Sequence, residues 1–338
     1  MSIELHLTIP QINVALGEIG VDEAADRLSA LQKLAGYANS QPLPAHSLRQ
    51  LAAFLFDLPA SNDLSNNLPI AALSRLADSG HWDAGWWLRL EPVHFRPDRD
   101  DLMLFGPEKL ELTIEEGAAL AASVRDHLAE ENLSLEINEP QRWYLPFETP
   151  PDCRFADLSV VNGQPIGEAM PTGKDAPIFK SLLNQLQMLL HVHPVNQVRT
   201  EQGKLTANGV WFWGGGAFGE INPRQWDAVW TNTALFRGLA LLAGNEPARV
   251  PDNFNTWFAA DPQGEQLIVL PAVDLKALES EWFEPMLLAL QEKLLDKVVI
   301  NLPASKRTFS LTPRRLKYFW RRPLALHKLF PIPAVTSE

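Results

Sequence analysis

Residues 171–216 read PTGKDAPIFKSLLNQLQMLLHVHPVNQVRTEQGKLTANGVWFWGGG and combine several patterns in one short segment. A Thr-Gly-Lys turn is followed by apolar residues at helical spacing from Phe179 to Leu190. A His-x-His-Pro-x-Asn-x-x-Arg run then leads into an aromatic strand, 209–213, which ends in three glycines. Because this order brings cationic and polar side chains close to a buried strand, it predicts a site for an anionic ligand.

Several residue types in this segment suit an anion. Lysine, arginine and histidine side chains donate charge-assisted hydrogen bonds to phosphate or carboxylate groups, and backbone amides in a glycine-rich turn can do the same. The alternative interpretation is structural: His193-Pro194 ends a helix, Arg199 pairs with a surface acid, the tryptophans fill the core and the glycines form a tight turn. The predicted ligand-binding residues are Thr172, Lys174, His193, Asn196, Arg199, Asn208, Trp211, Trp213, Gly214 and Gly216.

The rest of the chain alternates strands and helices. Apolar runs at 3–9, 267–270 and 298–302 predict buried strands, and helical spacing at 281–295 separates the last two. Residues 86–150 predict a compact strand–strand–helix–strand unit whose helix begins at a capping box. This order predicts an α/β fold, with a mixed sheet flanked by helices and a smaller inserted α+β domain. We expect the core to comprise 1–85 and 205–338, and the insertion to comprise 86–204.

Composition narrows the function classes. The 338 residues carry a formal net charge of −12, which repels nucleic acid and anionic membranes, so we expect neither general nucleic-acid binding nor membrane association. Cys153 is the only cysteine, which suits a reducing compartment and gives no sign of an activated thiolate. The sequence shows no signal-peptide pattern and no apolar run of transmembrane length, so we expect a cytoplasmic protein.

The segment HPVNQVRTEQGKLTANGVWFWGGG, 193–216, resembles the signature of the archaeal-type cofactor-independent phosphoglycerate mutases. The turn at 171–174 resembles the Thr-Gly-Lys turn of that family, and 89–147 resembles its inserted substrate-side domain. The whole chain is similar to the RpfE-type regulatory proteins, which are relatives of these mutases. The resemblance implies a reduced alkaline-phosphatase-like sheet for the core and a mutase-like insertion.

Departures from the mutase pattern bear on the chemistry. The family holds two divalent metals through an N-terminal Asp-Gly motif, a nucleophilic serine and a C-terminal Asp/His cluster, and both metals serve phosphoryl transfer. Here residues 3–20 contain no aspartate, and no histidine occurs between Gly216 and His327. We therefore expect a regulatory relative that has no cofactor and no metal-dependent catalytic centre. It would bind a small phosphorylated or carboxylated metabolite.

Two other functions stay open at this point. A metal-dependent phosphomutase or phosphatase would need a divalent metal at a non-standard site. A protein-interaction module would use exposed tryptophans and the basic, aromatic segment 314–328, which holds six Lys/Arg residues and could dock a protein partner. Alternatively, the apolar members of that segment pack on the body of the protein while its arginines stay solvated. The His/Asp residues considered for the metal site are His81, Asp83, His94, Asp98, Asp100 and Asp101.

Overall fold

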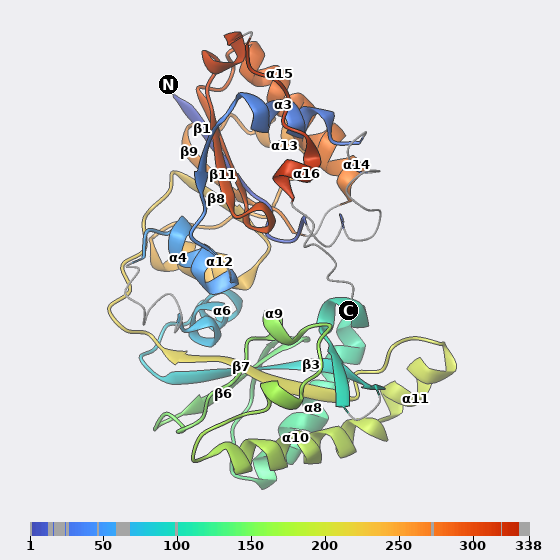
Figure 1. Ribbon diagram of the computed structural model, residues 1–338. Helices are drawn as coiled ribbons and strands as arrows, with labels where there is room; N and C mark the ends of the chain where they lie inside the picture. The colour runs from blue at the N-terminus through green and yellow to red at the C-terminus, as the bar shows by residue number, and fades with distance from the viewer. Residues whose placement is uncertain are drawn as a thin grey trace. The chain divides into compact units, whose positions relative to one another are not determined.

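The computed structural model describes residues 2–12, 16, 24, 27–45, 47–58, 68–98, 101–271, 274–318 and 320–330 (Figure 1). It divides into a larger unit, Met1–Ala60 with Asn222–Glu338, and a smaller unit, Ser61–Ile221. These limits differ from the predicted insertion at 86–204. The reason is that the strand at 209–217 pairs with the strand at 86–98, and the helix at 70–79 packs on both, so these segments belong to the smaller unit.

The larger unit is built on a six-stranded mixed sheet, in which β1 (Ile3–Thr8) lies centrally. It is parallel to β9 (Gly264–Val269) on one side and to β10 (Lys297–Leu302) on the other. The two predicted strands at 267–270 and 298–302 are therefore both present, but the N-terminal strand separates them. The sheet is completed by parallel β8 (Ala228–Thr231) and by antiparallel β11 (Arg307–Leu311) and β2 (Asn39–Pro42).

One face of this sheet carries the main hydrophobic core. Alternation along β1 sends the fully buried Leu5 and Leu7 to that face, beside Ile268 and Ile300 of the flanking strands. Helices cover this face, and their apolar stripes complete the core (Figure 1). These elements are α3 (Ser29–Tyr37), α13 (Phe254–Ala259), α14 (Leu275–Ala277), the π-helical turn η2 (Leu278–Phe283), α15 (Glu284–Gln291) and α16 (Leu326–Leu329).

Other elements of the larger unit are shorter. Helix α4 (Leu48–Leu55) belongs to this unit, and α12 (Ala234–Leu242) follows β8 and contacts it. The 3-10 turns of this unit are η3 (Pro303–Ser305) and η4 (Arg315–Lys317).

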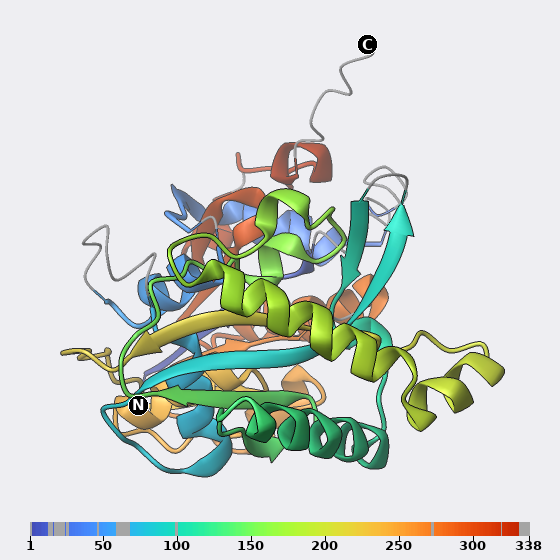
Figure 2. The same ribbon diagram turned by 90° about the horizontal axis from the view of Figure 1, so that it is seen from below.

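The smaller unit is built around the long strand β3 (Trp86–Asp98). It pairs antiparallel with β7 (Gly209–Ala217), β6 (Arg142–Phe147) and β4 (Asp101–Phe105), and β5 (Glu136–Glu139) extends the sheet beyond β6. Helices α8 (Ile114–Glu130) and α10 (Ala176–His191) cover one face, and α6 (Ile70–Ser79) packs on the other (Figures 1 and 2). The predicted capping box is present, because Thr113 and Glu116 exchange side-chain and backbone hydrogen bonds at the start of α8.

The predicted α/β class is thus confirmed, with a mixed sheet flanked by helices and a second unit of α+β type. Helices long and apolar enough to cross a membrane do not occur among the described residues. Short elements complete the smaller unit: α7 (Pro107–Leu110), α9 (Leu158–Val161), η1 (Gly167–Ala169) and α11 (Pro194–Glu201).

Candidate functional site

The Thr-Gly-Lys turn packs against a neighbouring loop of the smaller unit. Thr172 exchanges two backbone hydrogen bonds with Arg154, of 2.7 and 3.2 Å. Gly173 has a φ of +121°, and a Cβ atom there would lie 3.1 Å from the Cα atom of Cys153, so the turn requires glycine. The Thr172 and Lys174 side chains are exposed. Burial raises the pKa of the Cys153 thiol, and Asp175 and Asp152 raise it further, which disfavours a reactive thiolate.

His193 caps the start of α11. Its Nδ1 accepts a hydrogen bond of 3.2 Å from the Val195 amide, and its Nε2 lies 3.0 Å from the Ser123 hydroxyl oxygen. Burial lowers the pKa of His193, which agrees with a neutral ring that accepts at Nδ1. The structural interpretation placed the end of a helix at His193-Pro194, but α10 ends at His191 and these two residues instead begin α11.

Asn196 and Arg199 are buried in the smaller unit and engaged by the chain's own groups. The Asn196 side-chain amide donates hydrogen bonds to the Leu190 and Ala207 carbonyls and accepts one from the Ala207 backbone amide. The nitrogen and the oxygen of the Asn196 side chain are therefore both occupied. Arg199, at 1% exposure, donates to the Leu205 and Leu110 carbonyls and forms an ion pair of 2.6 Å with Glu116. Both side chains therefore hold the loop after α11 in place, and anion binding by either would require breaking these contacts.

Asn208 extends the pairing between β7 and β3 through its side chain. It accepts from the Phe95 amide at 2.7 Å and donates to the Phe95 carbonyl at 2.9 Å, as a strand backbone would. Trp211 is buried and donates to the Ala156 carbonyl at 3.0 Å. Both contacts are structural, in line with the alternative interpretation of these residues.

The glycine triplet continues strand β7 instead of forming the expected turn. Gly214 has a φ of +71°, and a Cβ atom there would lie 3.2 Å from the Ile70 Cβ. A Cβ atom at Gly216 would lie 2.9 Å from the Pro69 Cα. The glycines therefore allow the start of α6 to lie close to β7. The predicted residues consequently face different partners, and ligand binding by them stays a prediction.

A buried charged pair on the α6 side of the sheet was not singled out from the sequence. Arg89 pairs with Glu91, donates to the Ser74 hydroxyl at 2.9 Å, and lies 4.8 Å over the Trp213 ring. Burial raises the pKa of Glu91, and Arg89 opposes that shift. Within the described residues, the Arg89 Nε and the Trp213 Nε1 have no hydrogen-bond partner. The alternation WWLRLE at 86–91 was the available signal, since it puts Arg89 and Glu91 on one face.

The alternative metal site at His81 and Asp83 is not assembled. Burial alone would raise the pKa of Asp83, but hydrogen bonds from Trp87 and Gly85, together with Arg75, outweigh it and lower the pKa. The His81 Nδ1 lies 2.8 Å from the Ser79 carbonyl oxygen. Two other residues considered for this metal site have partners of their own: the His94 Nδ1 contacts the Thr206 carbonyl, and the Asp101 carboxylate accepts a hydrogen bond from the Gly167 amide. Asp100 lies outside the described residues.

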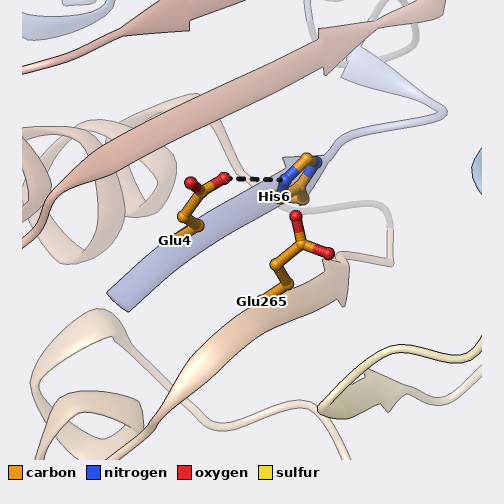
Figure 3. Close-up of side chains that lie close together, drawn as sticks. All are labelled: Glu4, His6 and Glu265. Carbon is orange, nitrogen blue, oxygen red and sulfur yellow. Dashed lines mark ion pairs between the residues drawn. The ribbon is translucent and has the colours of Figure 1, made fainter. Parts of the chain in front are cut away.

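A different group suited to a metal lies in the larger unit, where Glu4 and His6 of β1 face Glu265 of β9 (Figure 3). One ligand atom from each residue falls within 4.8 Å of the others. Both carboxylates already have cationic partners: Lys297 Nζ lies 2.9 Å from Glu4, and Arg224 pairs with Glu265.

His6 stays neutral within this group. Burial, followed by Lys297 and Arg224, lowers the pKa of His6 to about 4. Its ring meets the edge of Trp226 at a centroid distance of 4.8 Å, and its Nε2 has no hydrogen-bond partner among the described residues. The group is therefore balanced in charge by the protein itself.

The carboxyl ends of the central strands carry a neutral hydrogen-bond network. The buried Asn301 of β10 donates to the Thr8 hydroxyl of β1 at 3.0 Å and accepts from Thr308 of β11 at 2.9 Å. Open α/β sheets commonly bind ligands at this edge. Among the described residues, this network consists of hydroxyl and amide side chains and contains neither a carboxylate nor an imidazole.

The basic segment 314–328 packs on the larger unit along its described residues. Arg315 donates to the Tyr37 carbonyl at 3.1 Å, and Arg321 donates to the Ala38 carbonyl at 3.1 Å, at the end of α3. Leu326 is buried in the core, while Trp320 is 64% exposed. This arrangement agrees with packing on the body, and docking of a protein partner by the segment stays a prediction.

Comparison with known proteins finds sequence similarity to one group of enzymes. No protein-family model matches the chain. It is 30% identical over 182 residues to the 2,3-bisphosphoglycerate-independent phosphoglycerate mutase of Methanothrix thermoacetophila, covering 50% of this chain and 45% of that protein. It is 24% identical over 218 residues to a probable mutase of the same name from Geobacter sulfurreducens, covering 61% and 52%. The chain thus spans about half the length of these relatives.

A solved structure of a cofactor-independent phosphoglycerate mutase from Thermoplasma acidophilum aligns with a TM-score of 0.41 and 12% sequence identity, over 97% of this chain and 98% of that one. The sequence similarity supports the predicted relation to the cofactor-independent phosphoglycerate mutases.

Proposed function

We propose that this protein is a regulatory relative of the phosphoglycerate mutases, of the RpfE type. It binds a small phosphorylated or carboxylated metabolite and does not carry out metal-dependent mutase chemistry. The relation in sequence supports the family part of the proposal. The part concerning chemistry rests on one observation, which is the internal charge balance of Glu4, His6 and Glu265.

A divalent metal at this group would have to compete with two resident cations. Lys297 and Arg224 already pair with the two carboxylates. If a divalent metal took over these carboxylates, both cationic side chains would lose their partners and lie close to the doubly charged metal ion. Breaking a partly buried ion pair leaves an uncompensated charge, which is costly. The residues at hand therefore do not fit the two-metal centre that the resemblance implies.

The strand ends add independent support. Metal-dependent phosphoryl transfer needs anionic or imidazole ligands. The network formed by Thr8, Asn301 and Thr308 uses its hydroxyl and amide groups to satisfy one another at the edge where a ligand would be expected. Neutral, mutually satisfied groups hold strands together and are weak metal ligands.

The test combines metal analysis, an activity assay and a binding screen on the purified protein. We expect a substoichiometric content of divalent metal and no mutase turnover with Mn²⁺ or Zn²⁺ added. In a thermal-shift screen of phosphorylated three-carbon acids, nucleotides and simple anions, we expect metal-independent stabilisation by at least one compound.

Within the described part of the chain, the Glu4–His6–Glu265 group offers the residues that a metal-dependent enzyme could use, since their ligand atoms lie within 4.8 Å of one another. Stoichiometric metal that is lost in Glu4→Gln but kept in Glu292→Gln, an exposed control in the same unit, would establish this second candidate and refute the first. Turnover that depends on the same residue would do so as well.

A further inference from the structure

A pocket of about 430 Å³ opens in the larger unit, and Glu4, His6 and Glu265 are not among its lining residues. Three segments form it: α3 supplies Lys33 and Tyr37, α15 and the turn after it supply Leu287 and Lys293, and the segment after β11 supplies Leu316 and Lys317. Its volume falls within the range of roughly 300–1,000 Å³ that is typical of small-molecule sites.

The charge of the lining is unusual for this protein. Three of its residues are lysines, and the lining includes no acidic side chain, although the chain as a whole carries a net charge of −12. Within the described part of the chain, none of the three lysines makes an ion pair. Converging like charges repel one another, so an anion in the pocket would relieve that repulsion.

Helix capping does not account for this concentration of charge. Cations near the last turn of a helix ordinarily serve its free carbonyl groups. At the end of α3, Arg315 and Arg321 already donate to the carbonyls of Gly36, Tyr37 and Ala38. Lys33 lies one turn earlier in α3 and is exposed, so it is available to a ligand.

We propose that this pocket binds the phosphate group of a small, soluble phosphorylated compound. Lys33, Lys293 and Lys317 would surround the phosphate, since lysine binds it as a mobile point charge. The organic part of the ligand would lie on Leu287, Leu316 and Tyr37. This inference rests on the proposed function for its assumption that the chain binds a small anion, and it places that anion outside the 171–216 segment.

A phosphate group could also come from a lipid headgroup, so the test needs two kinds of probe. The soluble probes are inorganic phosphate, pyrophosphate and ADP, measured by calorimetric titration at low ionic strength. The lipid probe is a vesicle of phosphatidylcholine containing phosphatidic acid, measured by co-sedimentation. We expect the full chain to bind pyrophosphate or ADP and to leave the vesicles in the supernatant.

Three variants locate the site. Lys33→Gln and Lys317→Gln each replace an exposed pocket lysine, and each should weaken binding about five- to tenfold, a range that allows for solvent screening. The matched control, Lys276→Gln, removes an exposed lysine of the larger unit that does not line the pocket, and it should bind like the unaltered protein. Unfolding midpoints of all three variants should match that of the unaltered chain, since these side chains are exposed.

Several results would overturn the pocket assignment. Affinity equal to that of the unaltered protein in the pocket variants, or weaker binding only in Lys276→Gln, would place the anion elsewhere while leaving the proposed function intact. Binding to vesicles without binding to the soluble probes would assign the lysines to a lipid surface. Absence of binding to any probe would remove both the pocket assignment and the metabolite-binding part of the proposed function, and the metal and activity measurements would stand apart from it.

Discussion

Glu279 caps helix α3 through the backbone amide of Ala30, which lies 249 residues away along the chain. The same carboxylate accepts from the Leu31 amide at 3.4 Å and from the Ser29 hydroxyl at 3.2 Å. Leu28, at the N-cap position of α3, offers no side-chain cap of its own. The π-helical turn η2 therefore supplies the anion that the start of α3 needs.

Replacing Glu279 with alanine should lower the free energy of unfolding by about 2 kcal/mol, because buried amides at the start of α3 lose their acceptor. Urea unfolding followed by circular dichroism measures this change. Glu281→Ala is the control, since Glu281 lies in the same turn but is exposed, and it should shift the midpoint little. Equal effects of the two substitutions would contradict the capping role.

The depressed pKa of His6 predicts a loss of stability in mild acid. Because the folded-state pKa is about 4 and lies below the unfolded value of 6.5, the neutral ring contributes stability above pH 6.5 that is lost as the pH falls toward 4. The shift corresponds to about 3 kcal/mol over this window. Burial makes the largest contribution to the lowered pKa, Lys297 and Arg224 add to it, and Glu265 and Glu4 oppose it.

Unfolding free energies measured between pH 7 and 4 check this expectation. His6→Leu, which removes the titrating ring, should flatten the pH dependence by about the same 3 kcal/mol. His327→Gln removes an exposed histidine and should leave the curve unchanged. A His6→Leu variant that keeps the full acid slope would show that other groups carry it.

Arg199→Ala should destabilise the smaller unit by about 3 kcal/mol, because it leaves Glu116 and two carbonyl groups without their donor. Arg125→Ala is the matched control, since Arg125 is 54% exposed on α8 and should cost less than about 0.5 kcal/mol. Chemical unfolding of both variants gives the comparison. Unchanged stability of Arg199→Ala together with weakened anion binding would favour the ligand role predicted from the sequence.

Gly36→Ala should loosen the basic segment. A Cβ atom at Gly36 would lie 2.8 Å from the Leu324 amide nitrogen and 2.9 Å from the Pro323 Cα, and both of these are backbone atoms with little room to move. We expect a loss of about 1–3 kcal/mol and faster tryptic cleavage after Arg321. Gly219→Ala, which has open space around it, should behave like the unaltered chain in both assays.

Local patterns were sufficient for several elements. An apolar run predicted β1, and the Thr113–Glu116 capping box predicted the start of α8. Such features depend on residues a few positions apart, so the sequence contains the whole interaction. The strand order did not follow from them, because pairing of β1 between β9 and β10 joins segments about 260 and 290 residues away from it.

In the candidate site, too, local sequence patterns indicated some features and long-range contacts decided others. The sequence identified Asn196, Arg199 and Asn208 as special polar residues, and all three are engaged in specific contacts. Asn196 contacts the nearby Leu190 and Ala207, whereas the partners of Arg199 and Asn208 include Leu110, Glu116 and Phe95, which are distant in sequence. Spacing alone therefore could not distinguish an anion-binding arginine from one that holds a loop.

The sequence by itself determined several of the strands and helices, the acidic balance of the chain and its relation to the mutases, because these follow from local side-chain chemistry and order. Tertiary structure decided which charges meet. Glu4 is neutralised by Lys297, and Lys33 comes close to Lys293 and Lys317 around one pocket, only because folding brings distant segments together. Electrostatic interactions depend on distance in space and on burial, and neither quantity is contained in the spacing of residues along a chain.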